Sequence, residues 1–137
     1  MLVLKIFKAS RMKYILLTII LQILLLANEI HYEHNFDKAL QKAKSQNREV
    51  MMIYTAVWCP ECNYMKDVVF KNREVYNYLE KYFIVLSLDV QKDKLPDGFE
   101  YMGIPTFFFI DKDAKEQAKI IGGAKADKFL EKLKALQ

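Results

Sequence analysis

The chain has 137 residues, with 21 Lys and Arg against 17 Asp and Glu, and it contains only two cysteines. This length suits one domain held by its own apolar core, because two cysteines are too few for a disulfide scaffold. Four of the basic residues lie within the first 27 positions, which leaves 17 basic against 17 acidic residues in the remainder. A neutral remainder without a basic patch excludes nucleic acid as the expected partner.

The first 27 residues have the pattern of a secretory signal peptide. Basic residues precede an apolar run over 15–27, no acidic residue interrupts them, and the small Ala27 ends the run. The run is shorter than the roughly 20 residues that a membrane-spanning helix needs, so we expect cleavage near Ala27; an uncleaved segment would act as an N-terminal anchor. Either outcome predicts a periplasmic or otherwise extracytoplasmic domain over 28–137, and Met12 offers an alternative start.

Strands and helices alternate along the remainder, as the apolar spacing and the turn residues indicate. Asn35 can cap the first helix, and unbroken apolar runs suit strands that are covered on both faces. The expected elements are an edge strand at 30–32, a helix at 35–46, a strand at 50–56, a helix from Cys59 or Pro60, a helix at 74–82, strands at 83–90, 106–110 and 116–121, and a last helix around 129–136. The polar segment 91–103 has a Pro-Asp-Gly turn and room for one short helix.

This order of elements predicts an α/β fold. Strands that alternate with helices pair in parallel, and the late hairpin over 106–121 adds antiparallel strands. We therefore expect a central mixed sheet of four to five strands flanked by helices.

The two cysteines lie in the stretch Trp58-Cys59-Pro60-Glu61-Cys62, directly after an apolar strand. A structural zinc site needs four ligands, so His31 and His34 would have to complete a Cys2His2 set. A static disulfide over this spacing would close a very small loop and would stabilise the fold little. A reactive dithiol is the third alternative.

The interpretation as a reactive dithiol accounts for both cysteines and for Pro60 between them. Pro60 fits the first turn of a helix, where its missing N–H costs nothing. The Cys59 sulfur then faces unpaired backbone N–H groups and the positive end of the helix dipole, which favour the thiolate. Cys62 lies one turn further along, toward the core. This placement predicts an exposed attacking thiol at Cys59 and a buried resolving thiol at Cys62.

Together with two later motifs, the cysteine stretch resembles the active site of the thioredoxin-fold thiol–disulfide oxidoreductases. The sequence Gly103-Ile104-Pro105-Thr106 precedes an apolar strand and resembles the cis-proline loop of the family. The pair Gly122-Gly123 follows the next strand, where the family has a glycine. The resemblance covers about residues 30–135. Within the family, this segment is similar to secreted thioredoxin-like domains and to the C-terminal domain of the DsbD reductase.

The resemblance implies a thioredoxin-like fold and a protein-disulfide oxidoreductase. Cys59 would attack a client disulfide and form a mixed disulfide, which Cys62 would resolve. Trp58, Ile104 and Pro105 would bind the substrate, because a cis Pro105 brings the Ile104 backbone beside the sulfurs, where an extended segment can pair with it.

The resemblance also implies partners. Client proteins would carry disulfides or thiols, with apocytochrome c as one candidate, and a membrane protein would donate the electrons. No cofactor and no metal is implied, and we expect a monomer. Pro60, Glu61 and Asp67 would modulate the reactivity of the pair.

Two positions depart from the family pattern. Ile53, six residues before the first cysteine, and Lys66, four residues after the second, stand where similar domains carry acids. The usual base for deprotonating Cys62 is therefore missing. Asp67, Glu61 or water are the alternatives.

Glu61 bears on the direction of electron flow. A carboxylate beside Cys59 disfavours the thiolate, whereas strong oxidants of this fold stabilise it. The motif therefore predicts a reducing or middling potential and a reductase of protein disulfides. The alternatives are a disulfide oxidase or isomerase with the same residues, and a thioredoxin-fold binding module without turnover.

Overall fold

The computed structural model describes residues 12–19 and 29–136. Residues 12–19 are helical. In the two described ranges, no helix combines the length and the apolar character needed to cross a membrane. Most of the predicted signal peptide, over 1–11 and 20–27, lies outside the described residues.

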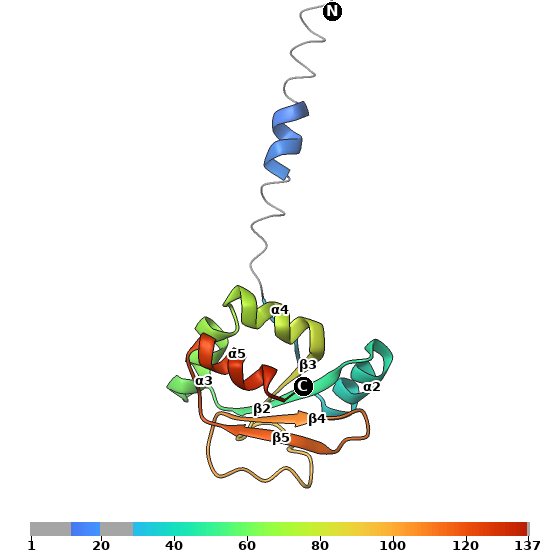
Figure 1. Ribbon diagram of the computed structural model, residues 1–137, viewed down its shortest axis with the longest axis vertical. Helices are drawn as coiled ribbons and strands as arrows, with labels where there is room; N and C mark the ends of the chain where they lie inside the picture. The colour runs from blue at the N-terminus through green and yellow to red at the C-terminus, as the bar shows by residue number, and fades with distance from the viewer. Residues whose placement is uncertain (1–11, 20–28, 137) are drawn as a thin grey trace, which may run out of the picture.

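The domain that follows is built on a mixed sheet, as predicted (Figure 1). Its elements are β1 (Tyr32–Glu33), α2 (Phe36–Gln46), β2 (Glu49–Thr55), α3 (Pro60–Tyr64), the π-helical segment η1 (Met65–Val69), α4 (Arg73–Tyr82), β3 (Phe83–Asp89), β4 (Thr106–Ile110), β5 (Glu116–Ile121) and α5 (Ala126–Lys134). Over residues 29–136 the sheet has five strands in the order β1-β3-β2-β4-β5. The strands β1, β3 and β2 are parallel, whereas β4 and β5 pair in antiparallel fashion.

The predicted elements are present, with small differences at their ends. The Asn35 side chain caps α2 by accepting the N–H of Lys38 over 2.9 Å, as predicted. The edge strand β1 has two residues and begins later than expected. The segment 91–103 forms turns and no helix, because Pro96 interrupts the backbone hydrogen bonding and Gly98 takes a φ of 87°.

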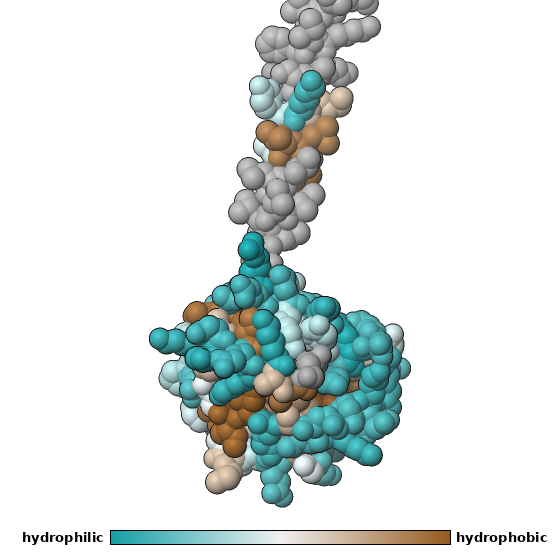
Figure 2. All heavy atoms as spheres, in the orientation of Figure 1, coloured by the Kyte–Doolittle hydropathy of each residue, from teal (hydrophilic) through white to brown (hydrophobic). Residues whose placement is uncertain are grey.

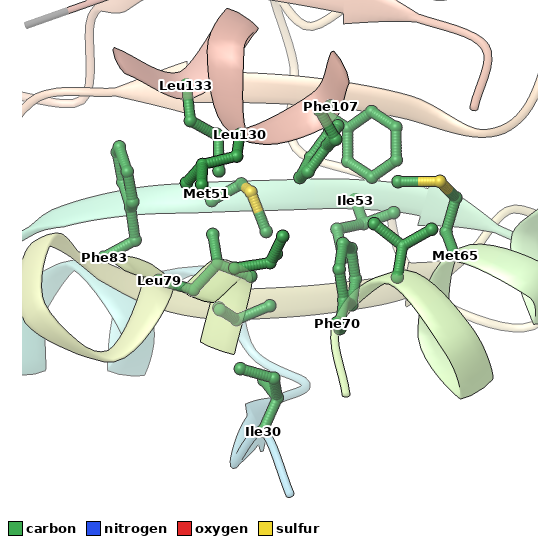
Figure 3. Close-up of a cluster of buried hydrophobic side chains, with 14 of the residues drawn as sticks. Ile30, Met51, Ile53, Met65, Phe70, Leu79, Phe83, Phe107, Leu130 and Leu133 are labelled. Carbon is green, nitrogen blue, oxygen red and sulfur yellow. The ribbon is translucent and has the colours of Figure 1, made fainter. Parts of the chain in front are cut away.

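Alternate residues of β2 face two separate apolar layers. Met51 and Ile53 point into a cluster covered by η1, α4 and α5, whereas Met52 and Tyr54 point into a second cluster against α2. Figure 3 shows the first cluster, with Leu130 of α5 on one side of it and Leu79 of α4 on another. Burial on both faces explains why this strand is apolar at nearly every position.

The helix that carries the cysteines changes pitch after its first turn and a half. The N–H of Phe70 donates to the carbonyl of Met65 over 2.9 Å, which closes a π-helical turn. Cys62, Met65 and Val69 are buried on one face, as their spacing predicts, and the wider turn also directs Phe70 inward. The Phe70 ring lies 5.7 Å from that of Phe129 in α5, so η1 is packed firmly against the core.

Candidate active site

A disulfide joins the two cysteines at the start of α3, with their Cα atoms 5.3 Å apart. Cys59 is the N-cap of α3, and the backbone N–H of Cys62 donates to its sulfur over 3.2 Å. Pro60 occupies the first helical position, as predicted. In the reduced protein, this N–H and the helix dipole stabilise a thiolate on Cys59.

Both cysteines are nearly covered in the oxidised state. Cys59 is 4% exposed and Cys62 is 1% exposed. The prediction of an exposed Cys59 was therefore wrong in degree, because Ala56 and Ile104 pack against the disulfide. Cys59 is still the more accessible of the two residues.

The Ile104–Pro105 peptide bond is cis and lies beside the disulfide. The carbonyl oxygen of Ile104 is 3.9 Å from the sulfur of Cys59. Pro105 is buried, and its own carbonyl accepts the N–H of Gly122 over 2.8 Å. The ends of β4 and β5 thus hold this loop, and the fold brings Ile104 to the cysteines.

Trp58 stands at the rim of the site with 59% of its surface exposed. Its indole N–H donates to Oε1 of Gln91 over 2.8 Å. The backbone N–H of Gln91 in turn donates to Oδ1 of Asp89, the last residue of β3. The indole therefore does not pack into the core; the turn that follows β3 sets its orientation.

Other apolar side chains are exposed on the segments that border the disulfide. They are Val57, Tyr101, Met102 and Ile121, of which Met102 is 96% exposed. Figure 2 shows hydrophobic surface on the left of the domain, the side on which Figure 1 places α3. An apolar rim around a sulfur suits contact with a protein segment rather than with a small charged molecule.

Glu61 lies in the first turn of α3 and is exposed. Its side chain crosses Gly123 so closely that a Cβ at that position would lie 2.9 Å from its Cγ. Gly122 has a φ of 81°, a left-handed conformation that favours glycine. The glycine pair thus serves two needs, the turn after β5 and room for the Glu61 side chain.

The structure places Asp67 away from the disulfide. Its side chain is 70% exposed, and its Oδ1 is 4.0 Å from Nζ of Lys71. It lines a hollow with Glu29 and Tyr32, and burial together with the Asp67 charge raises the pKa of the Tyr32 phenol.

The strand position that carries an acid in similar domains is apolar here for a structural reason. Ile53 is 2% exposed and lies among Met65, Phe70 and Phe107 (Figure 3). An ionised carboxylate in these surroundings would have no partner for its charge.

A polar hollow of about 270 Å³ begins next to this apolar cluster, where β2 and β3 end. Thr55, Ser87 and Asp89 line it from the strands, and Asn63 and Lys66 line it from the helix. Burial lowers the pKa of the Lys66 ammonium, and the charges of Asp89 and Asp67 oppose this shift. The Thr55 hydroxyl is buried and has no hydrogen-bond partner among the described residues.

The fold does not assemble the Cys2His2 alternative. Nδ1 of His34 lies 3.0 Å from the carbonyl oxygen of Ser87, and the cysteines are bonded to each other. Over residues 12–19 and 29–136, no group of three or more His, Cys, Asp or Glu side chains could hold a metal ion.

Three polar residues of the site were not among the residues predicted from the sequence. Gln91 orients Trp58, Asn63 donates to the Val57 carbonyl over 3.1 Å, and Thr55 lines the polar hollow. Asn63 directly follows the second cysteine, which was a usable local signal. Gln91 and Thr55 reach the site only through the pairing of β2 with β3.

Comparison with known proteins agrees with this geometry. The model of the thioredoxin-like domain family matches residues 36–137. The thiol:disulfide interchange protein DsbD of Actinobacillus pleuropneumoniae is 32% identical over 99 residues, which cover 67% of this chain and 17% of that protein. The chain thus spans less than a fifth of the length of such DsbD relatives.

Solved structures show the same fold. A thioredoxin from Thermus thermophilus is 26% identical, with a TM-score of 0.65 over 79% of this chain and 87% of that one. The oxidised C-terminal domain of Neisseria meningitidis DsbD is 22% identical, with a TM-score of 0.61 over 74% of this chain and 91% of that one, a likeness that concerns the fold alone.

The fold and the cysteine pair define a thioredoxin-like disulfide oxidoreductase. The chain belongs to the thioredoxin-like domain family, as its sequence motifs indicated. Cys59 and Cys62 form its redox pair at disulfide distance.

Proposed function

We propose that this protein is an extracytoplasmic reductase of protein disulfides, in which Cys59 attacks the client and Cys62 resolves the mixed disulfide. The observation that carries the proposal is the position of the Cys59 sulfur. It accepts the N–H of Cys62 on one side and lies 3.9 Å from the Ile104 carbonyl on the other.

The reaction proceeds in two exchanges. The Cys59 thiolate attacks one sulfur of the client disulfide, forms a mixed disulfide and releases the other client sulfur as a thiolate, which takes up a proton. The Cys62 thiol then loses its proton and attacks Cys59, which releases the second client thiolate. The client gains two electrons, and the pair ends as the disulfide seen here.

The cis loop and the apolar rim would bind the client. The Ile104 backbone borders the sulfur, so an extended client segment can pair with it there. Trp58 and Met102 offer exposed apolar surface for further contact with the client. These contacts would orient the client disulfide toward Cys59.

Glu61 supports the reducing direction. The helix N-terminus stabilises the Cys59 thiolate, and a carboxylate in the same turn opposes that effect. A less stable thiolate makes the reduced form a better electron donor. We therefore expect a potential well below the roughly −120 mV of strong oxidants of this fold.

The signal-like leader and the DsbD relatives support an extracytoplasmic site of action. A reductase in an oxidising compartment needs electrons from elsewhere, and we propose a membrane thiol–disulfide protein as the donor. Clients would be proteins whose cysteines must be kept reduced, with apocytochrome c as one candidate. We propose a monomer, with the leader either cleaved near Ala27 or retained as an anchor.

Insulin reduction tests the proposal directly. Wild-type protein should catalyse it, Cys59→Ser should abolish it, and Cys62→Ser should accumulate mixed disulfides with clients. Turnover that persists in Cys59→Ser would contradict the assignment of the attacking thiol. Equilibration with glutathione measures the direction, and a potential near that of the strong oxidants would favour an oxidase instead.

A further inference from the structure

The polar hollow described above lies directly behind the cysteine helix. Thr55 and Asp89 are paired residues at the ends of β2 and β3, and both line it. Ala56 lines it too, and the same residue packs against Cys59 and Cys62 on its other side. Ala56 thus connects the lining of the hollow with the residues that pack against the disulfide.

In the second exchange, the proton of the Cys62 thiol must leave through the region around the helix. Cys62 must lose its proton before it can attack, yet it is 1% exposed. Ile53 cannot act as a base for Cys62, and Asp67 lines a different hollow. A space of about 270 Å³ has room for several water molecules, and the unpartnered Thr55 hydroxyl offers one of them a hydrogen bond.

Lys66 brings a positive charge to this space. It follows Cys62 by four positions, so the two side chains leave neighbouring turns of one helix. Lys66 is partly buried and lines both this hollow and the one beside Tyr32, whose ring centre lies 5.7 Å from its Nζ. The charge of Asp89, which lines this hollow, also acts on the Lys66 ammonium. A cation in a partly buried setting favours a nearby thiolate more than a solvated cation does.

We propose that Lys66 is a positioning residue for resolution: its ammonium favours the Cys62 thiolate, and the released proton leaves through the hollow. This inference rests on the proposed attack by Cys59 and resolution by Cys62. In this step the Cys62 S–H bond breaks, its proton passes to water in the hollow, and the thiolate forms the S–S bond with Cys59 while the client thiolate departs. The other titratable groups that line this hollow or the neighbouring one, which Lys66 also lines, are His34, Asp89, Lys92, Asp93, Glu29, Tyr32, Asp67 and Lys71.

The test separates the two exchanges in one experiment. Reduced protein is mixed with excess 5,5′-dithiobis(2-nitrobenzoate), and the release of thionitrobenzoate is followed by stopped flow. The first phase reports the attack by Cys59, and the second reports the displacement by Cys62. Both phases are recorded from pH 5 to pH 10.

Lys66→Met should raise the pH midpoint of the second phase by about one unit. A thiol of higher pKa is also the better nucleophile once ionised, so the second phase at pH 7 should slow by only about threefold. Lys66→Arg keeps the charge and cannot give up a proton, so it should retain the wild-type midpoint. Lys71→Met, a matched change at an exposed lysine in the turn between η1 and α4, should leave both phases unchanged.

Two results would overturn the proposal. An unchanged midpoint in both Lys66→Met and Lys66→Gln would show that the charge does not act on Cys62. A Lys66→Arg variant as perturbed as Lys66→Met would show that the lysine acts by transferring its own proton. Loss of the second phase in Cys62→Ser and of both phases in Cys59→Ser tests the proposed function separately, so the two failures are distinguishable.

Discussion

The hydrogen bond between Trp58 and Gln91 gives the sharpest prediction about client binding. Gln91→Met removes the acceptor and keeps nearly the same length of side chain, so the 2.8 Å bond from the indole N–H is lost. A neutral hydrogen bond contributes about 0.5–1.5 kcal/mol net, and an exposed one belongs in the lower half of that range. We therefore expect kcat/KM for insulin reduction to fall about two- to fivefold.

The assay compares a protein disulfide with a small one. On the proposed mode of client binding, insulin contacts the rim, whereas 2-hydroxyethyl disulfide carries no peptide segment that could pair with it, so its rate should stay unchanged. Gln91→Glu retains an oxygen acceptor and should preserve the orientation of the indole. The reduction rate is measured by turbidity for insulin and by a coupled thiol assay for the small disulfide.

A double-mutant cycle decides whether the loss of the Trp58–Gln91 hydrogen bond causes the slower insulin reduction. In a Trp58→Phe background the donor is gone, so Gln91→Met should have no further effect on insulin reduction. If Gln91→Met costs as much in that background as in the wild type, Gln91 acts on something other than the indole. An unchanged rate in the single variant would mean that the orientation of Trp58 does not matter for clients.

Three further changes test the site and the core. Glu61→Gln should lower the pKa of the Cys59 thiol and make the reduction potential less negative, as measured by alkylation rate against pH and by glutathione equilibration; no change would place the carboxylate too far from the sulfur. Tyr54→Phe removes a buried hydroxyl that has no partner among the described residues, so stability at pH 7 should rise by about 1 kcal/mol in urea unfolding. Burial, with the charge of Tyr101, raises the pKa of Tyr54 to about 12. The unfolded protein therefore ionises this phenol first, so stability should fall as the pH rises from about 10 toward 12, and Tyr54→Phe should lack this fall. Phe70→Ala should cost about 3–5 kcal/mol in the same assay, because the ring is fully buried against Phe107 and Phe129; a cost below about 1 kcal/mol would contradict the packing of η1.

The strands were predictable because their burial leaves a direct mark on the sequence. The runs over 50–56, 83–90 and 106–110 are apolar at nearly every position, and they match β2, β3 and β4 within one residue. The position of Cys59 was predictable for a similar local reason, since Pro60 indicates where a helix begins. Structure that depends on neighbouring residues in the sequence, such as a buried strand or a helix start, could therefore be predicted from the local sequence pattern.

The supporting groups could not be predicted in this way. The contact of Gln91 with Trp58 requires the turn after β3 to lie beside the turn after β2, which is a property of the sheet. The π-helical turn at η1 accompanies the burial of Phe70, and the sequence around it carries no pattern that indicates such a turn. Lys66 was visible as a departure from the family, but its place beside the hollow depends on how the helix lies across the strand ends.

The two charges of the cysteine helix act on different thiols. On our proposal, Glu61 in the first turn of α3 opposes the ionisation of Cys59, whereas Lys66, which follows the resolving cysteine, favours the ionisation of Cys62. Together they bring the pKa values of the two thiols closer than the helix dipole alone would set them, because the dipole acts mainly on Cys59. A resolving thiol of lowered pKa shortens the life of the mixed disulfide, which suits an enzyme that releases reduced clients. The double variant Glu61→Gln/Lys66→Met should reverse both effects, so that resolution is about threefold slower and a larger share of the protein than in the wild type is found as the mixed disulfide with insulin after acid quench.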